Sequence, residues 1–224
     1  MIGAPRVHHR VADSTNERAK QLAMRGAPHG TLVTAGEQTA GRGRQGRSWL
    51  APAGGAVLMS LVLRELDERF PLLPLAAAVA VSEACESLAP VHCEIKWPND
   101  VWIDRRKVAG ILVEGRPGEG WAVLGIGVNV SAAPAQLGDA AALGPGVSVE
   151  SALSAVLGAL PHWLGKGVDQ VLEAWRARDA LRGEVVRWAN GAGTAGGIDD
   201  TGSLLVETDA GVVALGAGEV HLER

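Results

Sequence analysis

The stretch from Gly41 to Trp49 combines residue types that bind anions. It reads Gly-Arg-Gly-Arg-Gln-Gly-Arg-Ser-Trp, with arginines at positions 42, 44 and 47. A guanidinium is a planar fork of donors that matches a carboxylate or a phosphate. Glycine lets the backbone approach a ligand closely, and the indole of Trp49 offers a flat face on which a base can stack. We therefore expect a loop that closes over an anionic, nucleotide-like ligand.

Each of these residues also has a plainer interpretation. Arg42 and Arg44 occupy alternate positions and would point to one side of an extended loop, but a solvated basic loop has the same pattern. Arg47 would suit a structural salt bridge, and Trp49 would suit a core position. Lys107 stands at the start of an expected strand that would hold it rigidly, although a solvated lysine at a hairpin end has the same spacing.

Composition narrows the class of protein. The chain has 224 residues, of which 21 are basic and 25 acidic, giving a net charge of −4. A nucleic-acid-binding module is expected to be basic, so that alternative is disfavoured. Cys85 and Cys93 match no metal or redox motif, and we expect buried, neutral thiols in a reducing compartment. No signal peptide is visible in residues 1–10, and the apolar run 72–81 is too short to span a bilayer, so we expect a cytoplasmic protein.

The order of expected elements predicts an α+β fold. Ser14 and Glu17 form a capping-box pattern that predicts a helix over residues 15–25. Periodicity and turn residues predict the other elements. The expected strands are 31–35, 56–63, 94–97, 101–103, 108–114 and 121–130. The expected helices are 74–88, 149–164 and 168–181, with a kink or break at Pro161, and residues 131–147 read as a loop.

The sequence pattern changes after Gly183, where short apolar runs alternate with glycine-rich turns. This pattern predicts a small β-barrel of about 40 residues. We expect a catalytic domain over residues 1–181 and a barrel domain over residues 182–224.

Five segments, in this order, resemble the biotin–protein ligase family. They are Ser14-Thr15-Asn16, Gly41 to Trp49, Lys96-Trp97-Pro98-Asn99-Asp100, Lys107-Val108-Ala109-Gly110-Ile111-Leu112, and Gly125-Ile126-Gly127-Val128-Asn129. Each is modest alone, but the ordered set is specific. The resemblance implies a class II synthetase-like catalytic domain, with a mixed, mostly antiparallel sheet flanked by helices, followed by an SH3-like β-barrel.

The resemblance also implies a two-step ligase reaction. Biotin and ATP give biotinyl-5′-AMP, with Mg²⁺ accompanying the nucleotide, and a lysine of a biotin carboxyl carrier protein then takes the biotinyl group. Family members that repress transcription carry an N-terminal helix-turn-helix domain. Here the first motif begins at Ser14, so we expect the short form, a ligase without DNA binding. An exposed strand edge would also permit a homodimer.

The resemblance assigns roles to particular residues. Lys107 and Arg42 are expected at the reaction centre, and Asp100 is expected to bind Mg²⁺. The expected biotin contacts are Ser14, Thr15, Asn16, Gln38, Arg42, Gly43, Arg44, Lys107, Gly110, Gly125 and Gly127. The expected contacts to ATP or the adenylate are Arg44, Trp49, Asn99 and Asn129. Ser14 and its neighbours could instead be a simple helix cap, Gln38 a surface residue, and Asn99 a turn former.

A lipoate or octanoate protein ligase or transferase is the nearest enzymatic alternative, because it is thought to share this architecture. The Gly/Arg loop together with Lys96 to Asp100 favours biotin.

Overall fold

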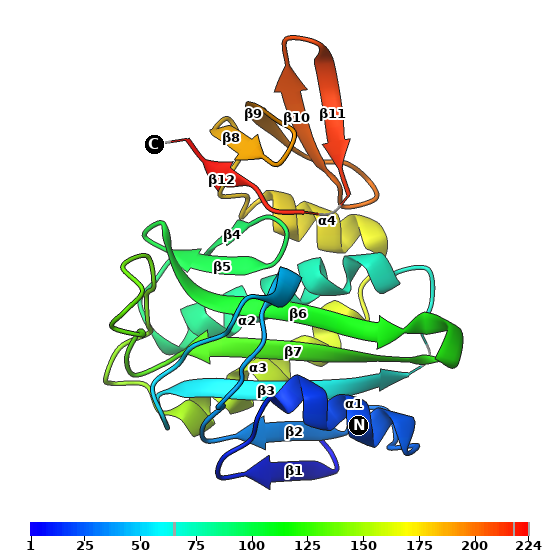
Figure 1. The fold of residues 1–224 in the computed structure, drawn as a ribbon, viewed down its shortest axis with the longest axis vertical. Helices are drawn as coiled ribbons and strands as arrows, with labels where there is room; N and C mark the ends of the chain where they lie inside the picture. Colours follow the sequence, from blue (N-terminus) through cyan, green and yellow to red (C-terminus); the bar gives the residue numbers. More distant parts are fainter. Residues whose placement is uncertain (65, 217, 224) are drawn as a thin grey trace.

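The computed structural model describes residues 1–64, 66–216 and 218–223. In this part of the chain the strands form two sheets, one in the body of the molecule and one at the C-terminal end (Figure 1). The body sheet contains β1 (Arg6–His9), β2 (Leu32–Ala35), β3 (Ala56–Arg64), β4 (Glu94–Lys96), β5 (Asp100–Ile103), β6 (Arg106–Arg116) and β7 (Trp121–Asn129).

The body sheet has the strand order β1-β2-β3-β7-β6-β5-β4 within the described residues. Its β1 and β2 are parallel, whereas the other neighbours are antiparallel. The predicted mixed, mostly antiparallel sheet is therefore confirmed. Strands β3 and β7 pair along their full length, from Ala56 opposite Asn129 to Arg64 opposite Trp121.

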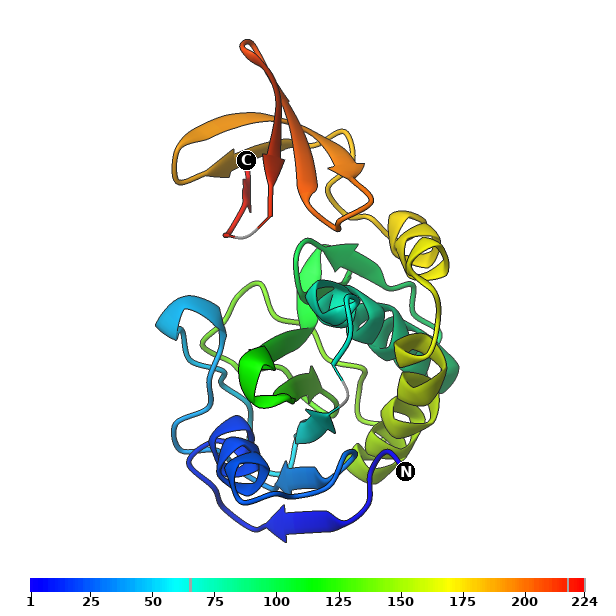
Figure 2. The ribbon, with the colours of Figure 1, turned by 90° about the vertical axis from the view of Figure 1, so that its right-hand side faces the viewer.

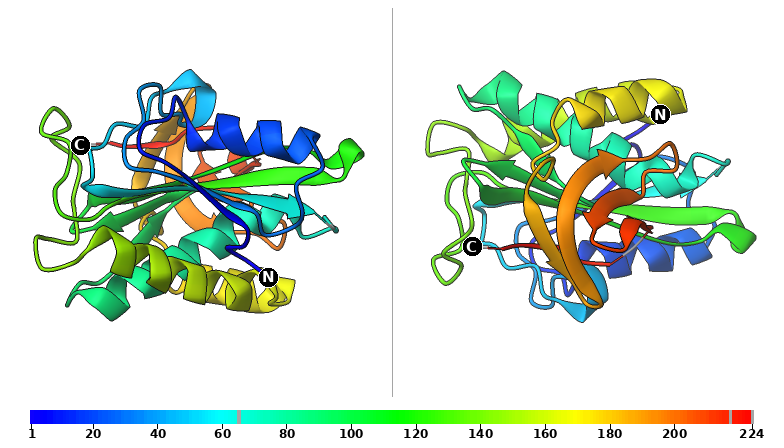
Figure 3. Two further views of the ribbon diagram at one scale, coloured as in Figure 1. Left: turned by 90° about the horizontal axis from the view of Figure 1, so that it is seen from below. Right: turned by 90° about the horizontal axis from the view of Figure 1, so that it is seen from above.

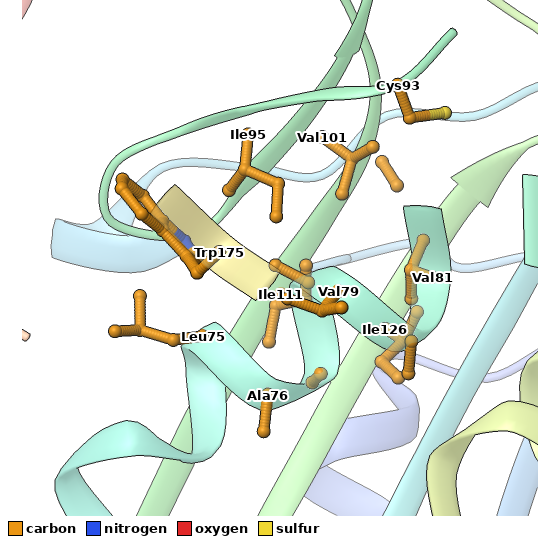
Figure 4. Close-up of a cluster of buried hydrophobic side chains, with 14 of the residues drawn as sticks. Leu75, Ala76, Val79, Val81, Cys93, Ile95, Val101, Ile111, Ile126 and Trp175 are labelled. Atoms are coloured by element: carbon orange, nitrogen blue, oxygen red, sulfur yellow. The ribbon is translucent and has the colours of Figure 1, made fainter. Parts of the chain in front are cut away.

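Helices cover both faces of the body sheet, which explains why its central strands are apolar on both sides. One face carries α1 (Thr15–Met24), and the other carries α2 (Leu73–Leu88) and α3 (Val149–Leu164) (Figure 3). The small residues of α2 allow close packing against α3 and β6. Figure 4 shows this core, where Leu75 and Val79 of α2 meet Ile111 of β6 and Trp175.

A short 3₁₀ turn, η2 (Phe70–Leu72), leads into α2 and lengthens the apolar helical run beyond the residues 72–81 noted from sequence. Residues 70–88 reach the length and hydropathy of a bilayer-spanning helix by composition alone. In the fold, the apolar side chains of this segment pack into the core instead.

The N-terminus of α1 is correctly predicted, but the capping box is wrong. Ser14 is the N-cap residue, yet its side chain makes no capping bond within the described chain. The Thr15 N–H is instead satisfied by Oε1 of Gln38 at 2.7 Å. Glu17 turns away from the helix start and pairs with Lys20 and Arg42.

Two predictions about the later helices also need correction. Pro161 does not break α3, because the helix continues to Leu164; the proline has no N–H to donate to the carbonyl four residues earlier, and α3 goes on without that one bond. Helix α4 (Val168–Arg176) ends five residues before the predicted residue 181. The segment after it runs beside β4 instead of continuing the helix, and the backbone of Ile95 forms hydrogen bonds with Arg178 and Ala180.

The C-terminal sheet is antiparallel and strongly curved (Figure 2), in agreement with the predicted all-β segment. Its strands are β8 (Val185–Trp188), β9 (Gly191–Ile198), β10 (Leu204–Thr208), β11 (Gly211–Leu215) and β12 (His221–Leu222). The buried Trp97 joins the two sheets, since its Nε1–H donates to the Gly202 carbonyl at 3.0 Å. Trp97 also packs within the hydrophobic core.

Candidate active site

A cavity of about 260 Å³ opens between the start of α1, the 41–49 loop, and strands β6 and β7. Its walls collect the predicted biotin and adenylate residues from segments far apart in the sequence. These lining residues are Ser14, Thr15, Asn16, Gln38, Arg42, Gly43, Arg44, Trp49, Asn99, Lys107, Gly110, Gly125, Gly127 and Asn129. Asp100 lies behind the wall and reaches the cavity only through Lys107.

The floor of the cavity requires glycine. Gly110 and Gly127 face each other in the β6–β7 register, and the indole of Trp49 lies on both of them. A Cβ atom built on Gly127 would overlap the indole, and one on Gly110 would come within 3.0 Å of its six-membered ring. A Cβ on Gly125 would overlap the side-chain amide of Asn16. Larger residues here would displace the side chains that line the site.

A polar network closes the end of the cavity beside α1. Ser60, in the middle of the apolar strand β3, donates to Oδ1 of Asn16 at 2.6 Å and lies 2.9 Å from the hydroxyl of Thr15. Thr15 in turn donates to Gln38 at 3.0 Å. Because Ser14, Thr15 and Asn16 are all buried, a ligand bound here must satisfy their remaining donors and acceptors.

Positive charge gathers at the opposite end. Nζ of Lys107 lies 2.7 Å from Oδ1 of Asp100 and 5.5 Å from the centre of the Trp49 ring. Lys96 lies behind it: burial lowers the pKa of Lys96, Asp100 opposes this shift, and the charges of Lys107 and Arg47 reinforce it. This end of the cavity is therefore suited to an anion.

The three loop arginines are anchored on three different parts of the fold. Arg42 pairs with Glu17 at 3.3 Å and lies 3.8 Å from Glu114. Arg44 donates to Oδ1 of Asn99 at 3.2 Å. Arg47 pairs with Glu219, just before β12, as expected for a structural salt bridge. The loop thus lies across the cavity mouth with its guanidinium groups held at separate points.

The expected magnesium site at Asp100 does not fit its surroundings. The carboxylate already pairs with the Lys107 ammonium, which a metal ion would have to displace. Magnesium favours several oxygen ligands. Residues 1–64, 66–216 and 218–223 contain no group of three or more His, Cys, Asp or Glu side chains that could hold a metal. Asp100 is better described as the partner that holds Lys107.

Sequence reasoning missed several residues of the site. The cavity wall also includes Met59, Ile126, Leu137 and Asp139, and Ser60 supports it from below. Ser60 could have been found from the sequence, because it is a lone serine within the apolar run 56–63. Asp139 sits in a loop that gave no such signal.

The arrangement suits a carboxylate-to-phosphate reaction. A polar pocket at one end can recognise a ring that carries donors and acceptors, and the cations at the other end can offset the repulsion between a carboxylate and a polyphosphate. The glycine floor and the cover provided by Trp49 leave room for an elongated ligand between the two ends.

Known proteins share both the sequence and the fold. Residues 8–131 match the biotin/lipoate A/B protein ligase family, and residues 192–222 match the biotin protein ligase C terminal domain. The chain is 37% identical to the biotin--[acetyl-CoA-carboxylase] ligase of Paracoccus denitrificans, with 93% of this chain and 96% of the relative covered. It is 34% identical to the bifunctional ligase/repressor BirA of Bacillus subtilis, covering 99% of this chain and 75% of the relative.

A solved structure agrees with these matches. The biotin protein ligase of Aquifex aeolicus in complex with biotin and ATP superposes with a TM-score of 0.85 at 30% identity, covering 99% of both chains. The chain therefore belongs to the biotin/lipoate A/B protein ligase family and, within it, to the biotin–protein ligases.

Proposed function

We propose that this chain activates biotin as biotinyl-5′-AMP and transfers the biotinyl group to a lysine of a biotin carboxyl carrier domain. One observation carries the proposal: a single cavity has the buried Ser14-Thr15-Asn16 set at one end and Lys107 at the other. The name of the Paracoccus relative supports the same reaction.

The first step joins two anions. A carboxylate oxygen of biotin attacks the α-phosphorus of ATP, the bond to the bridging oxygen breaks, and pyrophosphate leaves. Lys107 is positioned by Asp100 and by strand β6, where it can contact both the carboxylate and the α-phosphate. Arg42 and Arg44 at the cavity rim would add positive charge as it is needed in the transition state.

The second step uses the activated acyl group. The amine of a carrier lysine attacks the acyl carbon, the bond to the phosphate oxygen breaks, and AMP leaves. Trp49 and the 41–49 loop lie over the cavity floor, where they would shield the acyl-adenylate from water. Trp49, Asn99 and Asn129 are our proposed contacts to the adenylate. Mg²⁺ would accompany the phosphates of ATP, and we assign it no protein ligand.

The pocket beside α1 favours biotin over lipoate. The ureido ring of biotin offers donors and a carbonyl acceptor, whereas the dithiolane ring of lipoate could not satisfy the donors and acceptors of Ser14, Thr15 and Asn16 that the protein leaves free for a ligand. Unpaired buried polar groups reject a ligand strongly. ATP–pyrophosphate exchange with each acid tests this proposal. We expect exchange that depends on biotin, and exchange that depends on lipoate alone would overturn it.

The proposed partners are small molecules and the carrier domain. The chain has 25 acidic and 21 basic residues, and this excess of negative charge disfavours DNA binding. Specific retardation of DNA in a gel would contradict this expectation. We expect a cytoplasmic enzyme, where ATP and carboxylases are available. The outer side of the edge strand β1 would permit a homodimer, which sedimentation velocity can test.

A further inference from the structure

Glu114 of β6 contacts a residue of helix α1, Asn16, and a residue of the 41–49 loop, Arg42. Its Oε2 accepts a hydrogen bond from Nδ2 of Asn16 at 2.9 Å. Its Oε1 accepts from Lys20 at 3.0 Å and lies 3.8 Å from the guanidinium of Arg42. One carboxylate therefore links a residue of the proposed ring pocket to a residue of the anion-binding loop.

The surroundings of Glu114 form a closed group of charges. Glu17 pairs with the same two cations, at 3.0 Å from Lys20 and 3.3 Å from Arg42. Two carboxylates thus face two cations, and the charges balance. Lys20 and Glu114 are largely shielded, with 18% and 27% of their side-chain surfaces exposed, whereas Arg42 is half exposed at the rim.

The contacts of Glu114 determine how the Asn16 amide is turned. Asn16 receives the Ser60 hydroxyl on Oδ1 and gives one N–H to Glu114. A carboxylate can only accept hydrogen bonds, so it fixes the nitrogen of the amide on its own side. The second N–H of Asn16 is then left for an acceptor in the cavity that Asn16 lines.

We propose that Glu114 is a positioning residue for biotin, which orients the Asn16 amide as a donor and holds Arg42 at the cavity rim. Lys20 supplies the counter-charge that keeps Glu114 ionised in place. This inference rests on the proposed function, since it names the acceptor as the ureido carbonyl of biotin. It deepens that function by extending the recognition unit to a residue that does not line the cavity.

A glutamine at this position cannot perform the same role. Its amide oxygen would be drawn to Lys20 and Arg42, which turns its NH₂ group toward the Nδ2 atom of Asn16. Two NH₂ groups would then face each other. To avoid this, the Asn16 amide would have to flip, which turns its oxygen toward the new glutamine and its nitrogen toward Ser60. The donor offered to the ligand would be lost or misdirected.

The test compares Glu114→Gln with Glu150→Gln in ATP–pyrophosphate exchange. Glu150 is a matched control, because it also pairs with an arginine, Arg6, but lies on the surface with 68% of its side chain exposed. In Glu114→Gln we expect the KM for biotin to rise about 10- to 100-fold, the loss typical of leaving a buried polar group without its hydrogen-bond partner. The KM for ATP should stay within about twofold, and Glu150→Gln should match wild type.

A purely structural role would lower the amount of active enzyme and leave the KM for biotin unchanged. A folded Glu114→Gln variant with a KM for biotin within about threefold of wild type would overturn the inference. Should Glu114→Gln not fold, Glu114→Asp carries the test, because it keeps the charge but is too short to reach Asn16 and Lys20 together. A wild-type KM for biotin in that variant also overturns it.

The two proposals fail in different ways. A wild-type protein without biotin-dependent exchange would refute the proposed function. Normal wild-type exchange together with an unchanged KM in the Glu114 variants would refute only the positioning role.

Discussion

The indole ring of Trp49 occupies the space next to Gly127 that a side chain would fill, so a Cβ atom built there would overlap the ring. Gly110 provides the other half of this platform, opposite Gly127 on the neighbouring strand. The ring nitrogen of Trp49 is buried without a hydrogen-bond partner among the described residues, so the ring is held by packing on the two glycines and by the Lys107 ammonium, which lies 5.5 Å from its centre. The platform therefore controls how the loop covers the cavity.

A methyl group on this platform should damage activity without unfolding the protein. In Gly127→Ala the new Cβ would overlap Trp49 and push the ring off the floor. We expect kcat/KM for biotin to fall at least about tenfold, a loss of about 1.4 kcal/mol in transition-state binding. Exchange kinetics and a thermal melt measure both effects. Gly118→Ala is the control, because open space surrounds Gly118, and equal losses in both variants would contradict the account.

Lys107 should matter for chemistry far more than for folding. Lys107→Met keeps the length of the side chain and removes the charge beside Asp100. We expect the rate of adenylate formation to fall roughly 100-fold or more, as when one preorganised donor is removed. Single-turnover formation of biotinyl-5′-AMP is the measurement. The neighbouring exposed Arg106 provides the control variant Arg106→Met, and a rate near wild type in Lys107→Met would refute its assignment to the reaction centre.

We expect Arg44 to slow the release of biotinyl-5′-AMP from the enzyme. Its bond to Asn99 ties the loop to the turn between β4 and β5, and Arg44→Gly removes that tie while adding backbone freedom. We expect biotinyl-5′-AMP to leave the enzyme faster, measured as the half-life of labelled intermediate retained after gel filtration. Gln45→Gly is a suitable control, since Gln45 already has a φ of 53° and is exposed. Equal half-lives for Arg44→Gly and wild type would contradict the role.

Asp179 should lower stability at neutral pH. Its Oδ1 accepts from Leu181 N–H, but Oδ2 is buried without a partner among the residues described. Burial raises the pKa of Asp179 above its usual 3.8, although hydrogen bonds from Leu181 and Arg182 oppose the shift. A raised pKa means that stability is full below pH 3.8 and declines as pH rises through the folded-state value.

The variant Asp179→Asn removes this penalty, because a neutral amide can keep the bond to Leu181. We expect its Tm to exceed that of wild type by about 2–4 °C at pH 7, with the difference disappearing below pH 3.8. The exposed Asp209→Asn variant should show no such pH-dependent gain. An equal or lower Tm for Asp179→Asn at pH 7 would disprove the expectation.

Much of the fold followed from local patterns. The apolar run 56–63 and the alanine-rich run 74–88 became β3 and α2 within one residue at each end. The errors arose where distant chain segments compete for the backbone. Helix α4 ends early because the residues that follow it form backbone hydrogen bonds with Ile95. The first N–H of α1 is capped by Gln38, which lies 23 residues away from Thr15.

From the sequence, the residues that line the candidate site could be named, but the contacts between them could not be predicted. The resemblance named residues that line one cavity, because its motifs include the polar residues at the start of α1 and the glycines within β6 and β7. It did not identify Glu114 or Ser60, which act through Asn16 and come from segments 98 and 44 positions away from it. Such contacts depend on how strands and helices pack, and no spacing in the sequence encodes them.

Transfer to a carrier tests the central claim most directly. The purified chain is incubated with a biotin carboxyl carrier domain, biotin and ATP, and the intact mass of the carrier is measured. We predict that the carrier gains one biotinyl group on a lysine, with omission of either biotin or ATP abolishing the gain. A carrier that keeps its original mass, or that is modified only when lipoate replaces biotin, would contradict the assignment.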